Sequence, residues 1–351
     1  CAKLHALALP CVYVLARRYG LFGTRITHLV LGHFAHTKKG EPQAPQAGGT
    51  RPSIVGVERT HSSLRLAVLP VLGEIFGGNY AYVVYDEADT ERRALAVDAA
   101  DPEVVLRFVA EHKLKLTHLL TTHWHWDHSG GNRRVARAWP QVEVIGGADE
   151  GWRVPCATKL VRHADDFRAG ALSVRCHALR GHTRGSICYE VSLASRDTND
   201  AGPPLLFTGD ALFVGGCGAL FERSAAIMYD DLGRLFGAVP ADTLMCPGHE
   251  YTLMLLSQAA AKLKGNEQLR IKLATARAQR EQQAPTVPSR LGDELGYNLW
   301  ARAAVQRGDF GMFCSLCGVS DPVPDQRGAA NLAGSAQASV PLGPDGKLKA
   351  T

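Results

Sequence analysis

The chain lacks several features that define specialised classes of protein. Its N-terminal apolar run, residues 4–16, is too short to cross a bilayer. Its nine cysteines follow no repeating spacing, which excludes a disulfide framework and favours an intracellular, reducing compartment. Its net charge of +5 is modest, so we do not expect nucleic acid as a partner. What remains is an ordinary globular composition, 46% hydrophobic over 351 residues, which accommodates one large core with appendages.

Acidic side chains are absent from residues 1–40, although this segment carries several basic ones. Such a start is typical of a mitochondrial transit segment, of a helix lying on a membrane surface, or of a solvated arm. The first residue is Cys1 rather than Met, so we expect a fragment or a processed chain. Residues 40–49, rich in Pro, Gln and Gly, are typical of a linker. We therefore predict a basic N-terminal segment with linker over residues 1–60, and a mitochondrial or membrane-associated location with the cytoplasm as the alternative.

Short runs of β-forming residues follow the linker at 64–71, 80–85 and 94–97, which indicates a β-meander. Asp101 and Pro102 then open a helix, as N-cap and first-turn proline. Further strand-like runs at 116–120 and 142–145 make strand and helix alternate. This pattern predicts an α/β fold with a ligand crevice at the strand ends.

The polar loop after residues 116–120 holds the densest concentration of candidate metal ligands. His123 and His125 are two residues apart, so in an extended backbone their imidazoles emerge on one side and can hold one ion. Asp127 and His128 face elsewhere, towards a second ion. Four imidazole and carboxylate ligands within six residues exceed what one open zinc site needs, so the loop predicts two divalent ions.

Three later fragments supply the remaining ligands, although each alone is more typical of a structural feature. In residues 180–185, flanking glycines permit a tight turn that aims His182 inward. Residues 205–210 are a buried strand ending in Asp210, whose two carboxylate oxygens can bridge two ions. Residues 245–251 lead from an apolar run through Pro-Gly to a histidine. The predicted sets are His123, His125 and His182 on one ion, Asp127, His128 and His249 on the other, and Asp210 between them.

Two divalent ions also indicate the chemistry. They hold a water molecule that is deprotonated to hydroxide near neutral pH, and they polarise a substrate carbonyl. We expect Asp127 and Asp210 to be the catalytic carboxylates. No general acid is evident, and a thiolate leaves without one because its conjugate thiol has a pKa of about 8.5. We therefore predict hydrolysis of thioesters, with zinc as the metal and iron or manganese as alternatives.

The ordered set of seven ligands resembles the signature of the metallo-β-lactamase superfamily. Within it, residues 78–80, 215–218, 248–251, 286–289 and 297–298 are similar to the glyoxalase II (hydroxyacylglutathione hydrolase) branch. The resemblance spans about residues 64–304. Residues 17–20 and 23–34 are also similar to the start of the glyoxalase II-like proteins of paroxysmal nonkinesigenic dyskinesia.

This resemblance implies a four-layer αββα catalytic domain over residues 61–250 and a helical C-terminal domain over residues 251–313. The composition of the remaining tail, residues 314–351, predicts disorder. The implied substrate is a glutathione thioester such as S-lactoylglutathione, which is hydrolysed to glutathione and lactate.

The substrate side departs from the pattern of the branch. Where the branch has Cys-Gly-Lys-Phe-Tyr, whose Lys and Tyr hold glutathione, this chain has Ala219 and Phe221. Tyr251 is retained and is expected to orient the thiol carrier, but the Arg-x-x-Lys element of the branch has no counterpart in residues 328–351. Each lost charge-assisted hydrogen bond costs about 1.5–3 kcal/mol. We expect the chemistry to be kept and the carrier, or its affinity, to differ.

Three other functions fit part of the sequence. A persulfide dioxygenase would use mononuclear iron, but residues 248–251 and the helical region after them favour the hydrolase. A membrane-associated regulatory protein with a retained metal site would explain the basic start and the lost glutathione contacts. A nuclease of the same superfamily would need an inserted domain between Asp210 and His249, where only a short stretch is present.

Overall fold

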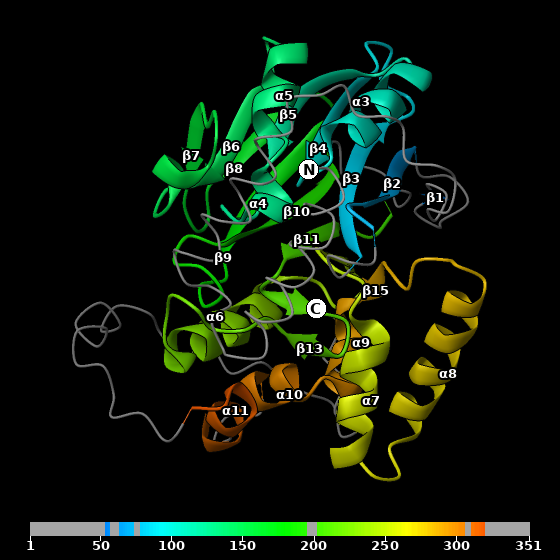
Figure 1. The fold of residues 1–351 in the computed structure, drawn as a ribbon, viewed down its shortest axis with the longest axis vertical. Coiled ribbons are helices and arrows are strands. Elements are labelled where there is room, and N and C mark those ends of the chain that lie inside the picture. Colours follow the sequence, from blue (N-terminus) through cyan, green and yellow to red (C-terminus); the bar gives the residue numbers. More distant parts are fainter. Residues whose placement is uncertain (1–52, 57–62, 74–77, 195–201, 306–309, 320–351) are drawn as a thin grey trace, which may run out of the picture.

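The computed structural model describes residues 53–56, 63–73, 78–194, 202–305 and 310–319. Within these residues, two β-sheets pack face to face and helices cover both outer faces (Figure 1). The predicted αββα layering is therefore confirmed. The segments predicted to carry the basic start, the similarity at residues 17–34 and most of the tail lie outside the described residues. No helix in the described part of the chain is long and apolar enough to span a membrane.

The first sheet has seven strands in sequential order. They are β1 (Ser53–Gly56), β2 (Leu64–Val71), β3 (Asn79–Asp86), β4 (Arg93–Val97), β5 (Lys115–Leu120), β6 (Glu143–Gly147) and β7 (Lys159–Val161). Strands β1 to β4 are antiparallel, as the predicted meander requires, and β4 to β7 are parallel. Because parallel strands end at one edge of a sheet, the loops that follow β4, β5 and β6 gather there.

Helices α3 (Pro102–Glu111) and α5 (Asn132–Ala138) cover the outer face of the first sheet (Figure 1). As predicted, α3 begins with Pro102, and the Asp101 carboxylate accepts a hydrogen bond from the Glu103 N–H. Its buried residues, such as Phe108, pack against alternate residues of β2 and β3. Burying an aliphatic or aromatic side chain of this size contributes about 1.5–3 kcal/mol, which fixes the helix on the sheet.

The second sheet has six strands, in the order β15-β14-β11-β10-β9-β8. Their bounds are β8 (Asp166–Ala169), β9 (Leu172–Ala178), β10 (Ile187–Leu193), β11 (Leu205–Gly209), β14 (Leu244–Pro247) and β15 (Ser289–Arg290). Tyr82 of the first sheet contacts Phe207 of the second, with ring centroids 5.2 Å apart in the core between the sheets. Strands β11 and β14 are parallel, so the residues that follow them also share an edge.

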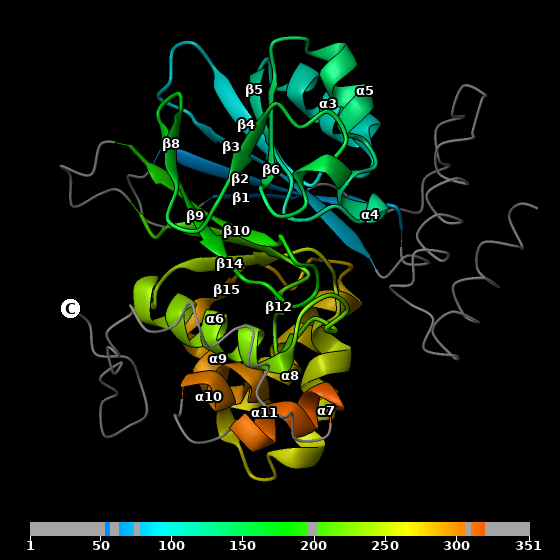
Figure 2. The same ribbon diagram turned by 90° about the vertical axis from the view of Figure 1, so that its left-hand side faces the viewer.

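The outer face of the second sheet is covered by the remaining long helices (Figure 2). These are α6 (Ala225–Ala238), α7 (Thr252–Lys262), α8 (Glu267–Glu281), α9 (Leu291–Tyr297), α10 (Leu299–Val305) and α11 (Phe310–Cys317). The buried Glu294 of α9 accepts hydrogen bonds from the Gly215 N–H at 2.8 Å and the Asn298 amide at 3.0 Å. This ties the C-terminal helices to the short hairpin of β12 (Leu212–Phe213) and β13 (Gly216–Cys217).

Three element positions differ from the segment boundaries expected from the sequence. Strand β1 lies after the predicted linker but within the predicted N-terminal segment of residues 1–60, and it pairs with β2, so the first sheet begins before residue 61. Strand β15 lies within the predicted helical domain and completes the edge of the second sheet beside β14. Helix α11 continues past residue 313 to Cys317, because Phe313 and Cys314 are both buried against the core. All seven cysteines in the described ranges are free thiols.

Candidate metal centre

The seven predicted ligands come from four segments that meet at one edge of the two sheets. His123, His125, Asp127 and His128 lie in the loop after β5 and in the short helix α4 (Trp126–Ser129). His182 lies in the connection between β9 and β10, Asp210 directly after β11, and His249 shortly after β14. The structure therefore brings all seven together, and their role as ligands remains a prediction.

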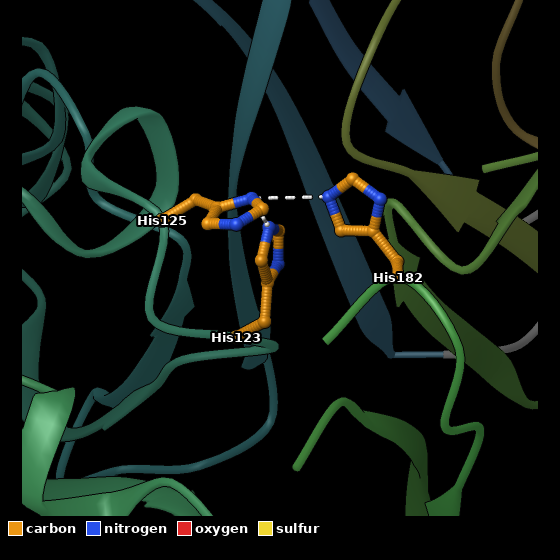
Figure 3. A group of neighbouring side chains, drawn as sticks. All are labelled: His123, His125 and His182. Atoms are coloured by element: carbon orange, nitrogen blue, oxygen red, sulfur yellow. Dashed lines mark hydrogen bonds between the residues drawn. The ribbon is translucent and has the colours of Figure 1, made fainter. Parts of the chain in front are cut away.

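The three histidines predicted to share one ion point their rings at one another. The His125 Nδ1 atom lies 2.9 Å from His123 Nε2 and 3.0 Å from His182 Nε2 (Figure 3). All three side chains are buried. Each offers one nitrogen within 4.8 Å of the nitrogens of the other two, which is the convergence that a tetrahedral metal with three imidazoles requires.

The second predicted set meets on the other side of Asp210. Ligand atoms of Asp127, His128 and His249 lie within 4.8 Å of one another. The Asp210 carboxylate faces both sets, with Oδ1 at 3.2 Å from His128 Nε2 and Oδ2 at 3.4 Å from His182 Nε2. Its Oδ2 also lies 3.3 Å from His249 Nε2, so Asp210 lies between the two sets, and its role as a bridge stays a prediction.

Hydrogen bonds outside the cluster orient the imidazoles. The Asp98 Oδ2 atom accepts a hydrogen bond from His128 Nδ1 at 2.9 Å, which leaves Nε2 facing the site. The Ala219 carbonyl does the same for His182, accepting from Nδ1 at 2.9 Å. Such contacts fix the tautomer and the ring orientation of metal-binding histidines.

The pKa shifts of three cluster residues suit metal ligation. That of His128 does not, because burial lowers its pKa but Asp210, Asp98 and Asp127 outweigh burial and raise it well above its ordinary value. Burial lowers the pKa of His123 well below its ordinary value, with a further contribution from His128, and burial likewise lowers the pKa of His182. For Asp210, burial favours the neutral acid, but His249 and His128 outweigh it and hold its pKa well below the ordinary range. Neutral imidazole and ionised carboxylate are the forms that bind divalent metals.

Several buried polar atoms of the cluster provide a direct test of whether a cation fits. His128 Nε2 and Asp210 Oδ1 face each other at 3.2 Å, yet neither atom forms a hydrogen bond. Unsatisfied buried polar atoms cost about 1–3 kcal/mol each and are rare in native proteins. A nitrogen lone pair and a carboxylate oxygen that point at the same place are the donor set of a divalent ion, so the residues fit the metal.

Glycines make room for the ligands at two positions where a side chain would collide. A Cβ on Gly248 would lie 2.5 Å from the His128 ring and 2.7 Å from Asp210 Oδ1. Gly209 has a positive φ of 50°, and a Cβ there would lie 2.3 Å from Thr122 Oγ1. Both strands of the parallel β11 and β14 pair can therefore approach the histidine loop closely.

Glu150 connects the two loops that carry the three-histidine set. It follows β6, is fully buried, and accepts hydrogen bonds from the Trp124 N–H at 2.9 Å and the Gly185 N–H at 3.0 Å. Burial raises its pKa to about 7, against the lowering effect of these hydrogen bonds. Sequence reasoning did not single out Glu150 or Asp98. In the sequence, these two residues are marked only as acids that follow the end of a strand, β4 for Asp98 and β6 for Glu150.

The predicted substrate residues line the same edge. The Phe221 ring lies 5.0 Å from the His182 ring between centroids, while the neighbouring Ala219 is exposed. The Tyr251 ring stacks on His249 at 4.7 Å with an interplanar angle of 4°. These three positions therefore flank the cluster, as the prediction requires, although their contact with substrate is not tested.

Two parts of the chain match known protein families. Residues 76–249 match the metallo-β-lactamase superfamily, and residues 250–325 match the hydroxyacylglutathione hydrolase C-terminus. A metallo-β-lactamase structure from Staphylococcus aureus shares the fold, with a TM-score of 0.52 and 20% identity over 74% of this chain and 70% of that one. The layered fold and the histidine-aspartate cluster thus define a protein of the metallo-β-lactamase class.

Curated relatives narrow the class. The chain is 38% identical to a hydroxyacylglutathione hydrolase-like protein of Mus musculus, over 68% of this chain and 80% of the relative. It is 38% identical to a cytoplasmic hydroxyacylglutathione hydrolase of Arabidopsis thaliana, over 64% of this chain and 84% of the relative. The chain belongs to the hydroxyacylglutathione hydrolase family.

Proposed function

We propose that this chain is a metal-dependent thioester hydrolase of the hydroxyacylglutathione hydrolase type. It acts on S-lactoylglutathione or a related thioester. The observation that carries the proposal is the convergence of His123, His125 and His182 on one side of Asp210, and of Asp127, His128 and His249 on the other. The matched C-terminal region and the curated relatives support the same activity.

The ligand set supports two divalent ions, and we propose zinc, with iron and manganese as alternatives. Imidazoles suit zinc and iron and carboxylates suit manganese, so this mixed set does not select one of the three metals. When bound, such ions lower the pKa of coordinated water and polarise a substrate carbonyl, which is the chemistry of hydrolysis.

The role of the chain is to hold this arrangement rigid before substrate arrives. Asp98 fixes the His128 ring, the Ala219 carbonyl fixes the His182 ring, and Glu150 joins their loops through backbone hydrogen bonds. Preorganised groups do not have to reorganise during the reaction, which lowers its barrier. No acid needs to deliver a proton to the leaving group, because a thiolate departs unprotonated near neutral pH.

The residues expected to contact the thiol carrier favour weak binding of glutathione. Phe221 presents a ring edge beside His182, and Ala219 has no side chain that can reach a carboxylate. Tyr251 remains available beside His249 to orient the carrier. We therefore propose hydrolysis with a high KM for S-lactoylglutathione.

The location is a separate proposal that rests only on residues 1–40. Their acid-free, basic composition supports a mitochondrial or membrane-surface protein.

A panel of thioesters tests the function. The purified chain is assayed with S-lactoylglutathione, other acyl-glutathiones and acyl thioesters of other thiols, and metal content is measured on the same batch. We expect thiol release from at least one thioester and about two equivalents of zinc, iron or manganese. Oxygen consumption with a persulfide and one equivalent of iron, without thiol release from any thioester, would identify a dioxygenase instead.

A further inference from the structure

A second cavity lies behind the loop that carries His182. Its volume is about 260 Å³, and its walls come from β7, from the connection between β9 and β10, and from α6. Strand β7 and helix α6 lie on the same side of the molecule (Figure 1). Four arginines and one histidine line it, namely Arg162, His163, Arg180, Arg184 and Arg234. Asp149 is the one acidic residue of the lining. We call this site the basic cavity.

The carboxylates around the basic cavity do not neutralise its arginines. Buried Asp231 accepts two hydrogen bonds of 2.9 Å from the Arg180 guanidinium and is also bonded to Arg234. Glu222 is likewise shared, since it pairs with Arg184 at 3.6 Å and with Arg153 at 2.5 Å. Each of these carboxylates thus serves two guanidinium groups. Asp230 also interacts with Arg180 and Arg234, so four acids face the four cavity arginines and Arg153, which leaves one positive charge in excess.

Some guanidinium N–H donors of the cavity arginines are also not used in hydrogen bonds among the described residues. A guanidinium has five N–H donors, and among the described residues no arginine of the basic cavity uses more than two of them in side-chain hydrogen bonds. Arg162 contributes one, to Asp149 at 3.2 Å, and both side chains of that pair are largely exposed. An exposed pair of this kind exchanges partners at little cost, so an incoming anion can take over the guanidinium.

The His163 side chain responds to this charge. Burial lowers its pKa, and Arg234 lowers it further, with a smaller contribution from Arg180. A neighbouring positive potential that disfavours a cation favours an anion by the same interaction.

We propose that the basic cavity binds a phosphate group. Guanidinium forks match the oxygens of phosphate in pairs, and several of them from separate elements suit a dianion better than a single carboxylate. Ligand pockets usually exceed about 300 Å³, so this cavity fits a small anion or one end of a larger ligand. The site is independent of the proposed hydrolase activity, because it uses none of the seven cluster residues.

The basic cavity shares its wall with the candidate metal centre. Gly185, Ser186 and Ile187 line it, and the Ile187 N–H donates a hydrogen bond of 2.9 Å to the Thr122 carbonyl beside His123. Two sources of the phosphate group are therefore consistent with its position. One is free phosphate, and the other is the phosphorylated end of a thiol carrier whose thioester reaches the metal centre.

Titration calorimetry on the full metal-loaded chain tests the proposal, with inorganic phosphate as the probe. Arg162→Ala and the double variant Arg162→Ala/Arg234→Ala remove cavity charge. Arg180 is kept so that buried Asp231, which loses Arg234 in the double variant, retains a guanidinium partner. Arg270→Ala is the matched control, because Arg270 also pairs with an acid three residues away, outside the cavity. We expect the phosphate Kd to rise about tenfold in the double variant, by a smaller factor in Arg162→Ala, and not in the control.

Phosphate also binds metal ions, so phosphate binding by the wild type alone does not test the proposal. The test is the difference in Kd between the wild type and the variants. If phosphate binds the double variant and the wild type equally, the proposal is wrong. Arg162→Ala guards against misfolding, because the Arg162 side chain is exposed and pairs with the partly exposed Asp149. Titrations with coenzyme A and with glutathione then distinguish the two sources of the phosphate group. Coenzyme A that binds more tightly than phosphate and loses affinity in the variants indicates the thiol carrier, and equal or weaker binding indicates free phosphate. Glutathione that binds more tightly than phosphate with the same sensitivity would replace phosphate by carboxylate as the ligand class.

Discussion

Asp210 is the residue on which the two ligand sets depend. It lies between them, with a carboxylate oxygen 3.2 to 3.4 Å from one nitrogen of His128, His182 and His249. Removing it takes away the carboxylate that lies between the two sets and leaves Asp98 and Asp127 as the acids facing the imidazoles.

We therefore expect Asp210→Ala to bind fewer than two equivalents of metal and to lose thioester hydrolysis by a factor on the order of 10³. Metal analysis and kcat on the same preparation check both effects. Asp242→Ala, at an exposed aspartate, is the control. An Asp210→Ala protein that retains two metals would show that Asp210 is not the bridge.

Glu150 gives a prediction about pH and stability. Its pKa is about 7 in the fold and 4.5 ordinarily, so the folded state favours the protonated acid. The free energy of unfolding therefore falls as pH rises from about 4.5 to 7, by about 3 kcal/mol from this group. Denaturant unfolding of wild type and Glu150→Gln at pH 5 and 7.5 checks this, because the glutamine does not titrate. Parallel pH profiles for the two proteins would contradict it.

Residue spacing predicted which side chains meet but not what holds them. The pairs at 123 and 125, and at 127 and 128, are close in sequence, so backbone geometry alone constrains them. Asp98 reaches His128 from the end of another strand, and Glu150 reaches Trp124 and Gly185 from a third. Such contacts depend on the register of neighbouring strands, which one sequence does not encode locally.

At the scale of elements, we expect the segment after β13 to determine which thiol carrier binds. Residues 217–221 leave the hairpin that Glu294 of α9 holds, and Phe221 then comes to rest beside His182. The hairpin position is thus set by the C-terminal helices, and Phe221 after it lies beside the cluster, where we predict that the carrier binds.

Restoring an amine and a hydroxyl in this segment tests its role. Ala219→Lys/Phe221→Tyr should lower KM for S-lactoylglutathione by about tenfold or more and leave kcat nearly unchanged, since the added contacts bind ground state and transition state alike. Steady-state kinetics measure both. Ala219→Met adds length without charge and should leave KM unchanged. A wild-type chain that already binds this thioester tightly, with no gain in the double variant, would place the carrier elsewhere.

Composition made the central elements predictable, but it did not predict the edge strands. Strands β2, β3 and β4 are runs of β-forming residues that are buried almost throughout, helix α3 has an apolar stripe and a proline-opened cap, and all four form where expected. Strand β15 has two residues and pairs with β14 only because the chain returns to the sheet. Short edge strands depend on this tertiary contact rather than on their own composition.

At the scale of the whole molecule, the site exists because two sheets present the same edge. Parallel pairing of β4 with β5 and of β11 with β14 directs Asp98, the histidine loop, Asp210 and His249 to one side. The αββα layering follows from the sequence pattern together with the resemblance. The convergence of the four ligand segments was predicted from the sequence, whereas the strand pairing that brings them together is visible only in the structure.

The central claim is that this edge holds two divalent ions that act together in hydrolysis. It is tested most directly by removing metal with a chelator and adding Zn²⁺ stepwise, with the rate on the best thioester of the panel measured at each step. The account predicts that activity rises until about two equivalents are bound and then stays constant. Full activity at one equivalent, with no change on addition of the second, would contradict it.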